Sequence, residues 1–238
     1  MLNEEIEILH RKVRLFDLES LGINQNKVIR DLKPTFEELP FDEHDVRVLG
    51  YSQRPFRSRA ITGFILTKTK DSWLIKQEEV KVFSQTVEDK RASPRRFKRI
   101  SQNVSNNPEF EKLLLGVAHL INLQCPGFNR LKFIAHQVRI FATPESKGSN
   151  SPEGIHKDGY DFVVPALVIN RQGITGGESQ IYGPDKEKLL FSATLQPGQA
   201  LLHEDKNGPL YHQVTPIETT AGIDYGVRDI FGFDIKLV

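Results

Sequence analysis

Two histidines and one aspartate have the residue types and spacing of a metal site. His156 and Asp158 stand at positions i and i+2 of the segment EGIHKDGYDF, so in an extended strand both side chains leave the same face. His212 follows in LYHQVTPI, which also has the composition of a strand. Two imidazoles and one carboxylate on one face of an octahedral metal leave three adjacent positions open. These residues therefore predict a transition-metal site that can also bind small molecules.

A second His-x-Asp pair competes for the same role. His203 and Asp205 precede His212 closely, and spacing alone does not choose between the two pairs. The stretch Lys206-Asn207-Gly208-Pro209 follows them and is typical of a hairpin loop. Metal ligands need rigid support, so a loop is the poorer place for them.

Arg228 lies on a predicted strand that has room on one side. Alternation in GVRDIFGFDI places Arg228, Ile230 and Gly232 on one face, with Asp229 on the other. A guanidinium inside a barrel needs an anion, and its planar fork suits a carboxylate. Two partners remain open at this point: the far carboxylate of a metal-chelating acid such as 2-oxoglutarate, and a neighbouring acid such as Asp229.

The elements that must position these residues fall into a helical start and a β-rich remainder. Apolar spacing predicts an amphipathic helix over 3–21, a weaker one over 26–39 broken at Pro34, and a clear one from Asn107-Pro108 to Pro126-Gly127. Residues 46–82 contain strand-like runs, and the polar, basic stretch 86–107 is expected to be a loop. From Leu131 to Val238, short strand candidates alternate with turns at the spacing of a sandwich or barrel.

Composition excludes several classes of protein. The 238 residues carry 32 Lys and Arg against 31 Asp and Glu, which argues against a dedicated nucleic-acid or membrane-surface binder. A single cysteine, Cys125, excludes an internal disulfide framework and a multi-cysteine zinc site. The sequence has no long apolar run and no secretory signal pattern at its start. We therefore expect a cytoplasmic protein with one domain, 1–238.

Five motifs together resemble one known family. They are His156-Lys-Asp158, Gly176-Gly177-Glu178, Gly198-x-x-Leu-Leu, His212-Gln-Val-Thr-Pro216 and Arg228-Asp-Ile. This set resembles the Fe(II)/2-oxoglutarate-dependent dioxygenases, and most closely the branch of free-amino-acid hydroxylases such as isoleucine 4-hydroxylase. The segment 134–143, IAHQVRIFAT, is similar to that branch too. The resemblance covers roughly 131–236 and thins upstream to short pieces at 54–60 and 95–101.

The resemblance implies a fold and an assignment of the site. The fold is mainly β with α: a double-stranded β-helix, or jelly-roll, core with the N-terminal helix and one central helix packed on one sheet. Residues 1–130 would support the metal-binding half, 131–238. The resemblance also assigns His156, Asp158 and His212 to Fe(II) and Arg228 to 2-oxoglutarate. Under this assignment His203 and Asp205 have no metal-binding role and are expected to belong to a polar hairpin.

The resemblance further implies an activity. The enzyme would use Fe(II), 2-oxoglutarate and O₂ to hydroxylate a C–H bond of a free L-amino acid or a close derivative, releasing succinate and CO₂. Ascorbate would stimulate the reaction. The substrate carboxylate needs a cation, for which Arg57, Arg59 and Arg139 are candidates, together with Gln137. Gln137 and Arg139 share a strand face and are expected to point into the barrel.

Two alternatives use the same residues differently. The basic run from Lys90 to Arg99 suggests the same chemistry on a protein or nucleic-acid substrate, but the near-neutral net charge argues against nucleic acid. A non-catalytic, cupin-like module could bind a metal or small ligand without turnover, but the complete triad with Arg228 argues against it. We therefore expect a small-molecule substrate, with no nucleic-acid or membrane partner.

Overall fold

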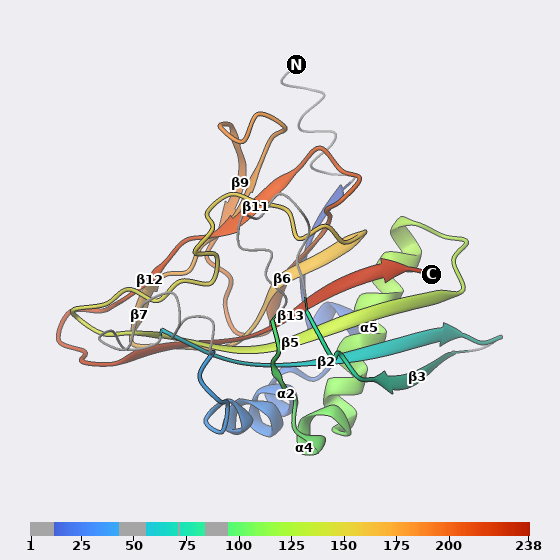
Figure 1. Ribbon diagram of the computed structural model, residues 1–238, viewed down its shortest axis with the longest axis horizontal. Helices are drawn as coiled ribbons and strands as arrows, with labels where there is room; N and C mark the ends of the chain where they lie inside the picture. Colours follow the sequence, from blue (N-terminus) through green and yellow to red (C-terminus); the bar gives the residue numbers. More distant parts are fainter. Residues whose placement is uncertain (1–11, 43–55, 71, 84–94) are drawn as a thin grey trace.

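A large, mostly antiparallel sheet forms the frame of the molecule (Figure 1). The structure, a computed structural model, describes residues 12–42, 56–70, 72–83 and 95–238. In spatial order the main strands are β1 (Val13–Asp17), β10 (Gln199–Glu204), β6 (Phe162–Gln172), β13 (Gly226–Leu237), β5 (Arg130–Ala142), β2 (Arg57–Lys68) and β3 (Trp73–Glu78). The short β4 (Lys98–Arg99) pairs in parallel with β2.

Two small sheets pack against one face of the large sheet. One has the order β11 (Tyr211–Val214), β8 (Ser179–Tyr182) and β9 (Leu189–Ala193), and the other pairs β12 (Ile217–Thr219) with β7 (Ile174–Gly176). Buried aliphatic side chains from the large and small sheets form a joint core, among them Val138, Val168, Ile181, Ile217 and Ile230. This two-layer β architecture confirms the predicted jelly-roll core.

Helices cover the opposite face of the large sheet (Figure 1). They are α2 (Gln25–Leu32) with the 3-10 turn η2 (Lys33–Phe36), and α5 (Pro108–Gln124), preceded by the short α4 (Gln102–Ser105). Phe110 of α5 lies against Phe231 and Phe233 of β13, with ring centroids 5.1 and 6.4 Å apart. Both faces of the central strands are therefore buried, one under helices and one under the small sheets.

Helix α5 begins where the sequence predicts. The side chain of Asn107 accepts a hydrogen bond from the backbone N–H of Glu109 at 2.8 Å, and Pro108 occupies the first turn. Both features are favourable at a helix N-terminus. The helix buries Leu113, Leu114 and Val117 and so supports the sheet that carries the site.

The N-terminal helix predicted over 3–21 is wrong from Val13 onward. Residues Val13–Asp17 form β1, which pairs with the edge of β10, and the 3-10 turn η1 (Glu19–Leu21) follows. The open edge of β10 offers unpaired backbone groups, and that pairing overrides the local helical spacing. The rest of that prediction lies outside the described residues, as do 43–55 and 84–94. The loop predicted over 86–107 contains β4 and α4.

Within the described residues, no helix combines the length and the hydropathy that a transmembrane span requires.

Candidate metal centre

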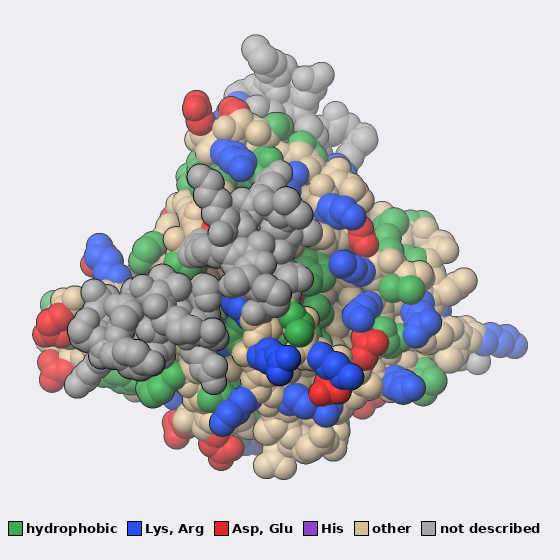
Figure 2. Space-filling model, in the orientation of Figure 1, with side chains coloured by type: hydrophobic (Ala, Val, Ile, Leu, Met, Phe, Trp, Pro, Cys, Tyr) green, Lys and Arg blue, Asp and Glu red, His purple; other side chains and the backbone are tan. Residues whose placement is uncertain are grey.

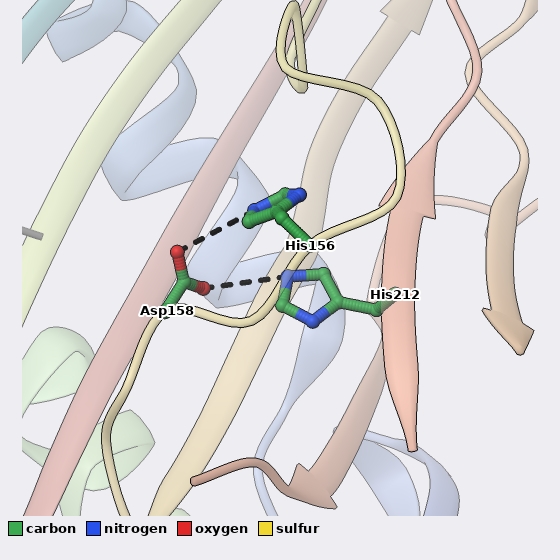
Figure 3. A group of neighbouring side chains, drawn as sticks. All are labelled: His156, Asp158 and His212. Carbon is green, nitrogen blue, oxygen red and sulfur yellow. Dashed lines mark ion pairs between the residues drawn. The ribbon is translucent and has the colours of Figure 1, made fainter. Parts of the chain in front are cut away.

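Three side chains converge where the loop before β6 meets β11. His156 and His212 face each other across an antiparallel bridge, each backbone N–H donating to the other residue's carbonyl at 3.0 Å. Both rings point toward the carboxylate of Asp158 (Figure 3). The Nε2 atoms of His156 and His212 lie 3.5 and 3.3 Å from its two oxygens, and one ligand atom from each of the three residues lies within 4.8 Å of the others. The expected strand around His156 is reduced to this single bridge, which is enough to bring the three groups together.

Local hydrogen bonding orients His156. Its Nδ1 donates to the carbonyl of Gly154 at 2.8 Å, which leaves Nε2 on the side of Asp158. His212 is held by strand pairing, because β11 places it opposite Ile181 of β8. Backbone pairing thus supports both imidazoles, as a metal ligand requires.

The electrostatics keep Asp158 ionised. Burial opposes the charge, but hydrogen bonds from His156 and His212 hold the pKa of Asp158 well below its usual range. Burial also disfavours a charged His156, yet the hydrogen bond and the charge of Asp158 raise the pKa of His156 to about 10. A metal ion that binds Nε2 of His156 must therefore displace a proton. Two imidazole nitrogens and a carboxylate oxygen are a donor set that fits Fe(II).

Arg228 lies on the same face of β13 as Ile230, which lines the pocket beside the three ligands. Its side chain is fully buried, and none of its three guanidinium nitrogens has a hydrogen-bond partner in the described parts of the chain. Burial, with Arg171 nearby, lowers its pKa to about 9. A buried guanidinium without a partner is costly, so these three orphaned donors fit an anion such as the carboxylate of 2-oxoglutarate.

Gly177 gives Arg228 room. Its φ is +66°, and a Cβ placed there would lie 3.0 Å from Cδ of Arg228 and 3.1 Å from Nη1 of Arg171. A side chain at this position would therefore be strained and would crowd the guanidinium. This explains the second glycine of the Gly-Gly pair before Glu178.

Comparison with known proteins identifies the family. The family model described as 2OG-Fe dioxygenase matches residues 33–234. The chain belongs to the 2OG-Fe dioxygenase family. It is therefore a 2-oxoglutarate-dependent dioxygenase that uses Fe(II), 2-oxoglutarate and O₂. No curated protein matches the chain.

Solved structures of similar fold accompany this family match. A bsmA homologue from Methylobium petroleophilum PM1 is 23% identical, with a TM-score of 0.80, over 99% of this chain and 92% of that one. IDO from Bacillus thuringiensis is 19% identical, with a TM-score of 0.76, over the full length of both chains. The Fe(II)/α-ketoglutarate-dependent dioxygenase TqaL is 14% identical, with a TM-score of 0.67, over 99% of this chain and 86% of that one. At these identities the likeness shows the fold.

A polar pocket of this dioxygenase opens beside the three ligands. It is lined by the ligands themselves and by polar and charged residues of β2, β5 and β13, among them Arg57, Arg59, His136 and Asp234. Arg57 is paired with the buried Asp42, at 2.9 Å from Nη2 to Oδ2. Arg59 donates from Nη2 to Nδ1 of His136 at 2.6 Å, and Nε2 of His136 then donates to Oδ2 of Asp234 at 2.9 Å. Both arginines are candidates from the sequence, but His136 and Asp234 are not, because only strand register brings them together.

Gln137 and Arg139 lie on the other face of β5, so the expectation that they point into the barrel is wrong. Gln137 donates to the hydroxyl of Thr35 in η2 at 2.8 Å. Arg139 donates from Nε and Nη2 to the two carboxylate oxygens of Asp229 at 2.6 and 2.9 Å. Alternation correctly placed the two residues on one face of β5, but this is the face of the sheet that the helices cover.

His203 and Asp205 do not form the expected polar hairpin. His203 belongs to β10, and both side chains are 0% exposed. They lie directly behind His212, and with it they form a second group whose ligand atoms are within 4.8 Å of one another. A turn does follow them, as Lys206-Asn207-Gly208-Pro209 predicts, but the pair itself belongs to the protein interior.

The basic run is divided by the structure. Lys90 and Arg91 lie outside the described residues, Arg95 lines the pocket, and Lys98 and Arg99 form β4. On the face drawn in Figure 2, Lys and Arg side chains gather on the right-hand half with Asp and Glu side chains among them. The charges on that face are therefore mixed in sign.

Proposed function

We propose that this dioxygenase hydroxylates a C–H bond of a free L-amino acid or a close derivative. Fe(II) would be held by His156, Asp158 and His212, and the far carboxylate of 2-oxoglutarate by Arg228. The observation that carries the substrate proposal is a buried cation, Arg59, in the pocket beside the three ligands. When bound, iron, 2-oxoglutarate and O₂ supply the oxidising chemistry, and the protein supplies orientation and a dry site.

Arg59 has the surroundings of a carboxylate receptor. Its guanidinium lies over the rings of Phe83 and Phe97, 5.3 and 4.7 Å from their centroids. Its Nε is buried and has no hydrogen-bond partner in the described ranges. Burial, with Arg57 nearby, lowers the pKa of Arg59 to about 10. A carboxylate from the substrate would satisfy this buried charge with charge-assisted hydrogen bonds.

An acidic group in the same pocket suits the other end of an amino acid. Asp234 lines the pocket and is joined to Arg59 through the ring of His136. Burial, with the charge of Asp158, raises the pKa of Asp234 well above its usual range. A substrate ammonium beside it would favour the charged carboxylate. One pocket thus presents a cation and an acid, the complement of a zwitterion.

Apolar side chains complete the pocket. Val138, Val164 and Ile230 line it together with the charged groups and the three ligands. Such a wall suits an aliphatic substrate side chain and keeps water from the reacting carbon. We therefore expect substrates of the aliphatic amino-acid class.

The test is a screen of the twenty amino acids with Fe(II), 2-oxoglutarate and ascorbate, with each product measured by mass. We expect one or a few amino acids to gain one oxygen atom, with one succinate released per product. Succinate formation without oxygen gain in any amino acid or amino-acid derivative would contradict the substrate class and leave the enzyme class intact.

A further inference from the structure

The buried residues His203 and Asp205 pack behind His212 and are not among the three candidate ligands. The ring of His203 lies 4.9 Å from that of His212, centroid to centroid, at an interplanar angle of 63°. Oδ1 of Asp205 lies 3.7 Å from Nδ1 of His212. Nε2 of His212 is directed to Asp158, so Asp205 faces the outer nitrogen of this ligand.

The cluster of His203, Asp205 and His212 contains three orphaned polar atoms. Nε2 of His203, Oδ1 of Asp205 and Nδ1 of His212 are all buried, and none has a hydrogen-bond partner within the described part of the chain. Buried polar atoms are nearly always satisfied, by protein or by ordered water. Three unsatisfied atoms in one cluster therefore indicate a shared hydrogen-bond partner.

The protonation of the three atoms is complementary. If Nε2 of His212 binds a metal, the neutral ring carries its hydrogen on Nδ1 and needs an acceptor there. Nδ1 of His203 donates to the carbonyl of Glu204 at 2.7 Å, so Nε2 of His203 is an acceptor. Oδ1 of Asp205 is an acceptor as well. The 3.7 Å between Oδ1 of Asp205 and Nδ1 of His212 is too long for a direct hydrogen bond. One bridging water molecule would accept a hydrogen bond from Nδ1–H of His212 and donate to the other two atoms.

The second oxygen of Asp205 holds the other ligand segment. Oδ2 accepts hydrogen bonds from the backbone N–H groups of Gly159 and Tyr160, at 2.6 and 3.3 Å. These two residues follow Asp158 directly. One carboxylate therefore contacts the segment of Asp158 with one oxygen and faces His212 with the other.

We propose that Asp205 is a positioning residue, which joins the two metal-binding segments and accepts the hydrogen bond of His212 Nδ1–H through one bridging water. It thereby holds His212 in the tautomer whose Nε2 can bind a metal. His203 completes the cluster as the second acceptor. The inference rests on the proposed ligation of the metal by His212. Outer partners of metal-binding histidines commonly act in this way.

The decisive variant is Asp205→Asn. Its amide oxygen can still accept from Gly159 and Tyr160, but its NH₂ group would face Nδ1 of His212 and turn that atom into an acceptor. The proton would move to Nε2 and compete with the metal. We expect metal affinity, measured by anaerobic equilibrium titration with Mn(II), to fall by about 10- to 100-fold. Unchanged Mn(II) affinity in folded Asp205→Asn would overturn the inference.

Asp229→Asn is the matched control. Asp229 is also 0% exposed, but it pairs with Arg139 on the opposite face of the sheet. The Asp229→Asn substitution removes the same charge as Asp205→Asn but leaves His203, Asp205 and His212 unchanged. The Mn(II) affinity of this variant should therefore stay within about twofold of the wild type. An equal loss in both variants would assign the effect to buried charge in general and overturn the inference.

A second measurement needs no Asp205 variant. In wild-type protein labelled with ¹⁵N-histidine and loaded with diamagnetic Zn(II), His212, assigned by its absence in His212→Gln, should carry its proton on Nδ1. A proton-free Nδ1 would overturn the inference. So would two Zn(II) ions per chain with His203 as a ligand, because the cluster would then be a second metal site.

Metal ligation by His212 and positioning by Asp205 can be tested separately. Weakened Mn(II) binding in His212→Gln together with wild-type binding in Asp205→Asn would refute the positioning role alone. Wild-type binding in His212→Gln would refute the ligand assignment itself.

Discussion

Replacing Arg228 by methionine should stabilise the protein and abolish its response to 2-oxoglutarate. The guanidinium is fully buried without a hydrogen-bond partner among the described residues. Its pKa falls from 12.5 to about 9, which corresponds to about 5 kcal/mol of destabilisation of the charged form in the fold. Below pH 9 Arg228 is charged in both the folded and unfolded states, so this cost is constant there.

Loss of side-chain packing will offset part of the gain. We therefore expect Arg228→Met to raise the free energy of unfolding by about 1–4 kcal/mol in the absence of 2-oxoglutarate. Arg228→Lys is the matched control, since it keeps a buried charge and should not gain stability. In the wild type, 2-oxoglutarate at 100 times its Kd should add about 2.7 kcal/mol, and in Arg228→Met the same concentration should add little.

The assay is urea unfolding of the three proteins with Mn(II) in place of Fe(II), with and without 2-oxoglutarate. The reasoning is refuted if Arg228→Met is less stable than the wild type without 2-oxoglutarate and both proteins are stabilised equally by it. That pair of results would mean that Arg228 has a partner inside the fold and does not receive the co-substrate.

Three further perturbations test other parts of the site. Gly177→Ala should raise the 2-oxoglutarate KM at least about tenfold, because its Cβ would crowd Arg228 from a left-handed backbone; steady-state kinetics that match the wild type would contradict this. Arg59→Met should raise the amino-acid KM by about 10- to 100-fold while the 2-oxoglutarate KM stays the same, since a charge-assisted carboxylate contact contributes about 1.5–3 kcal/mol, and an equal change in both constants would count against a substrate role. Burial and the charge of Arg59 hold the pKa of His136 well below its ordinary 6.5, so only the unfolded state takes up this proton as the pH falls below 6.5. Relative to His136→Gln, the wild type should then lose stability as the pH falls from 6.5 to 5, and parallel stability curves would show that His136 protonates normally.

The convergence of the three candidate ligands could be predicted from the family resemblance, but not from spacing alone, which left His203 and Asp205 as an alternative pair. His156, Asp158 and His212 do converge, although the first two lie in a loop with a single bridge and not in the expected strand. Helix α5 could be predicted because its cap, proline and apolar stripe all agree.

The wrong predictions have a common physical cause, which is tertiary contact. Alternation shows that Gln137 and Arg139 share a face, but both faces of β5 are buried, so no pattern shows which face points into the barrel. Helical spacing in 13–17 was overridden by pairing with β10. The interior position of His203 depends on β1 and β6 on either side of its strand, which a lone His-x-Asp pair does not reveal.

Anaerobic Fe(II) titration of the wild type and Asp158→Ala tests whether His156, Asp158 and His212 form the metal centre. We expect one tightly bound Fe(II) per wild-type chain and a loss of affinity of at least about 100-fold in Asp158→Ala, since a ligand itself is removed. The circular dichroism of the metal-free proteins should be the same, because the change shortens one side chain at the pocket. An Asp158→Ala variant that binds Fe(II) as tightly as the wild type would contradict the assignment of the metal centre.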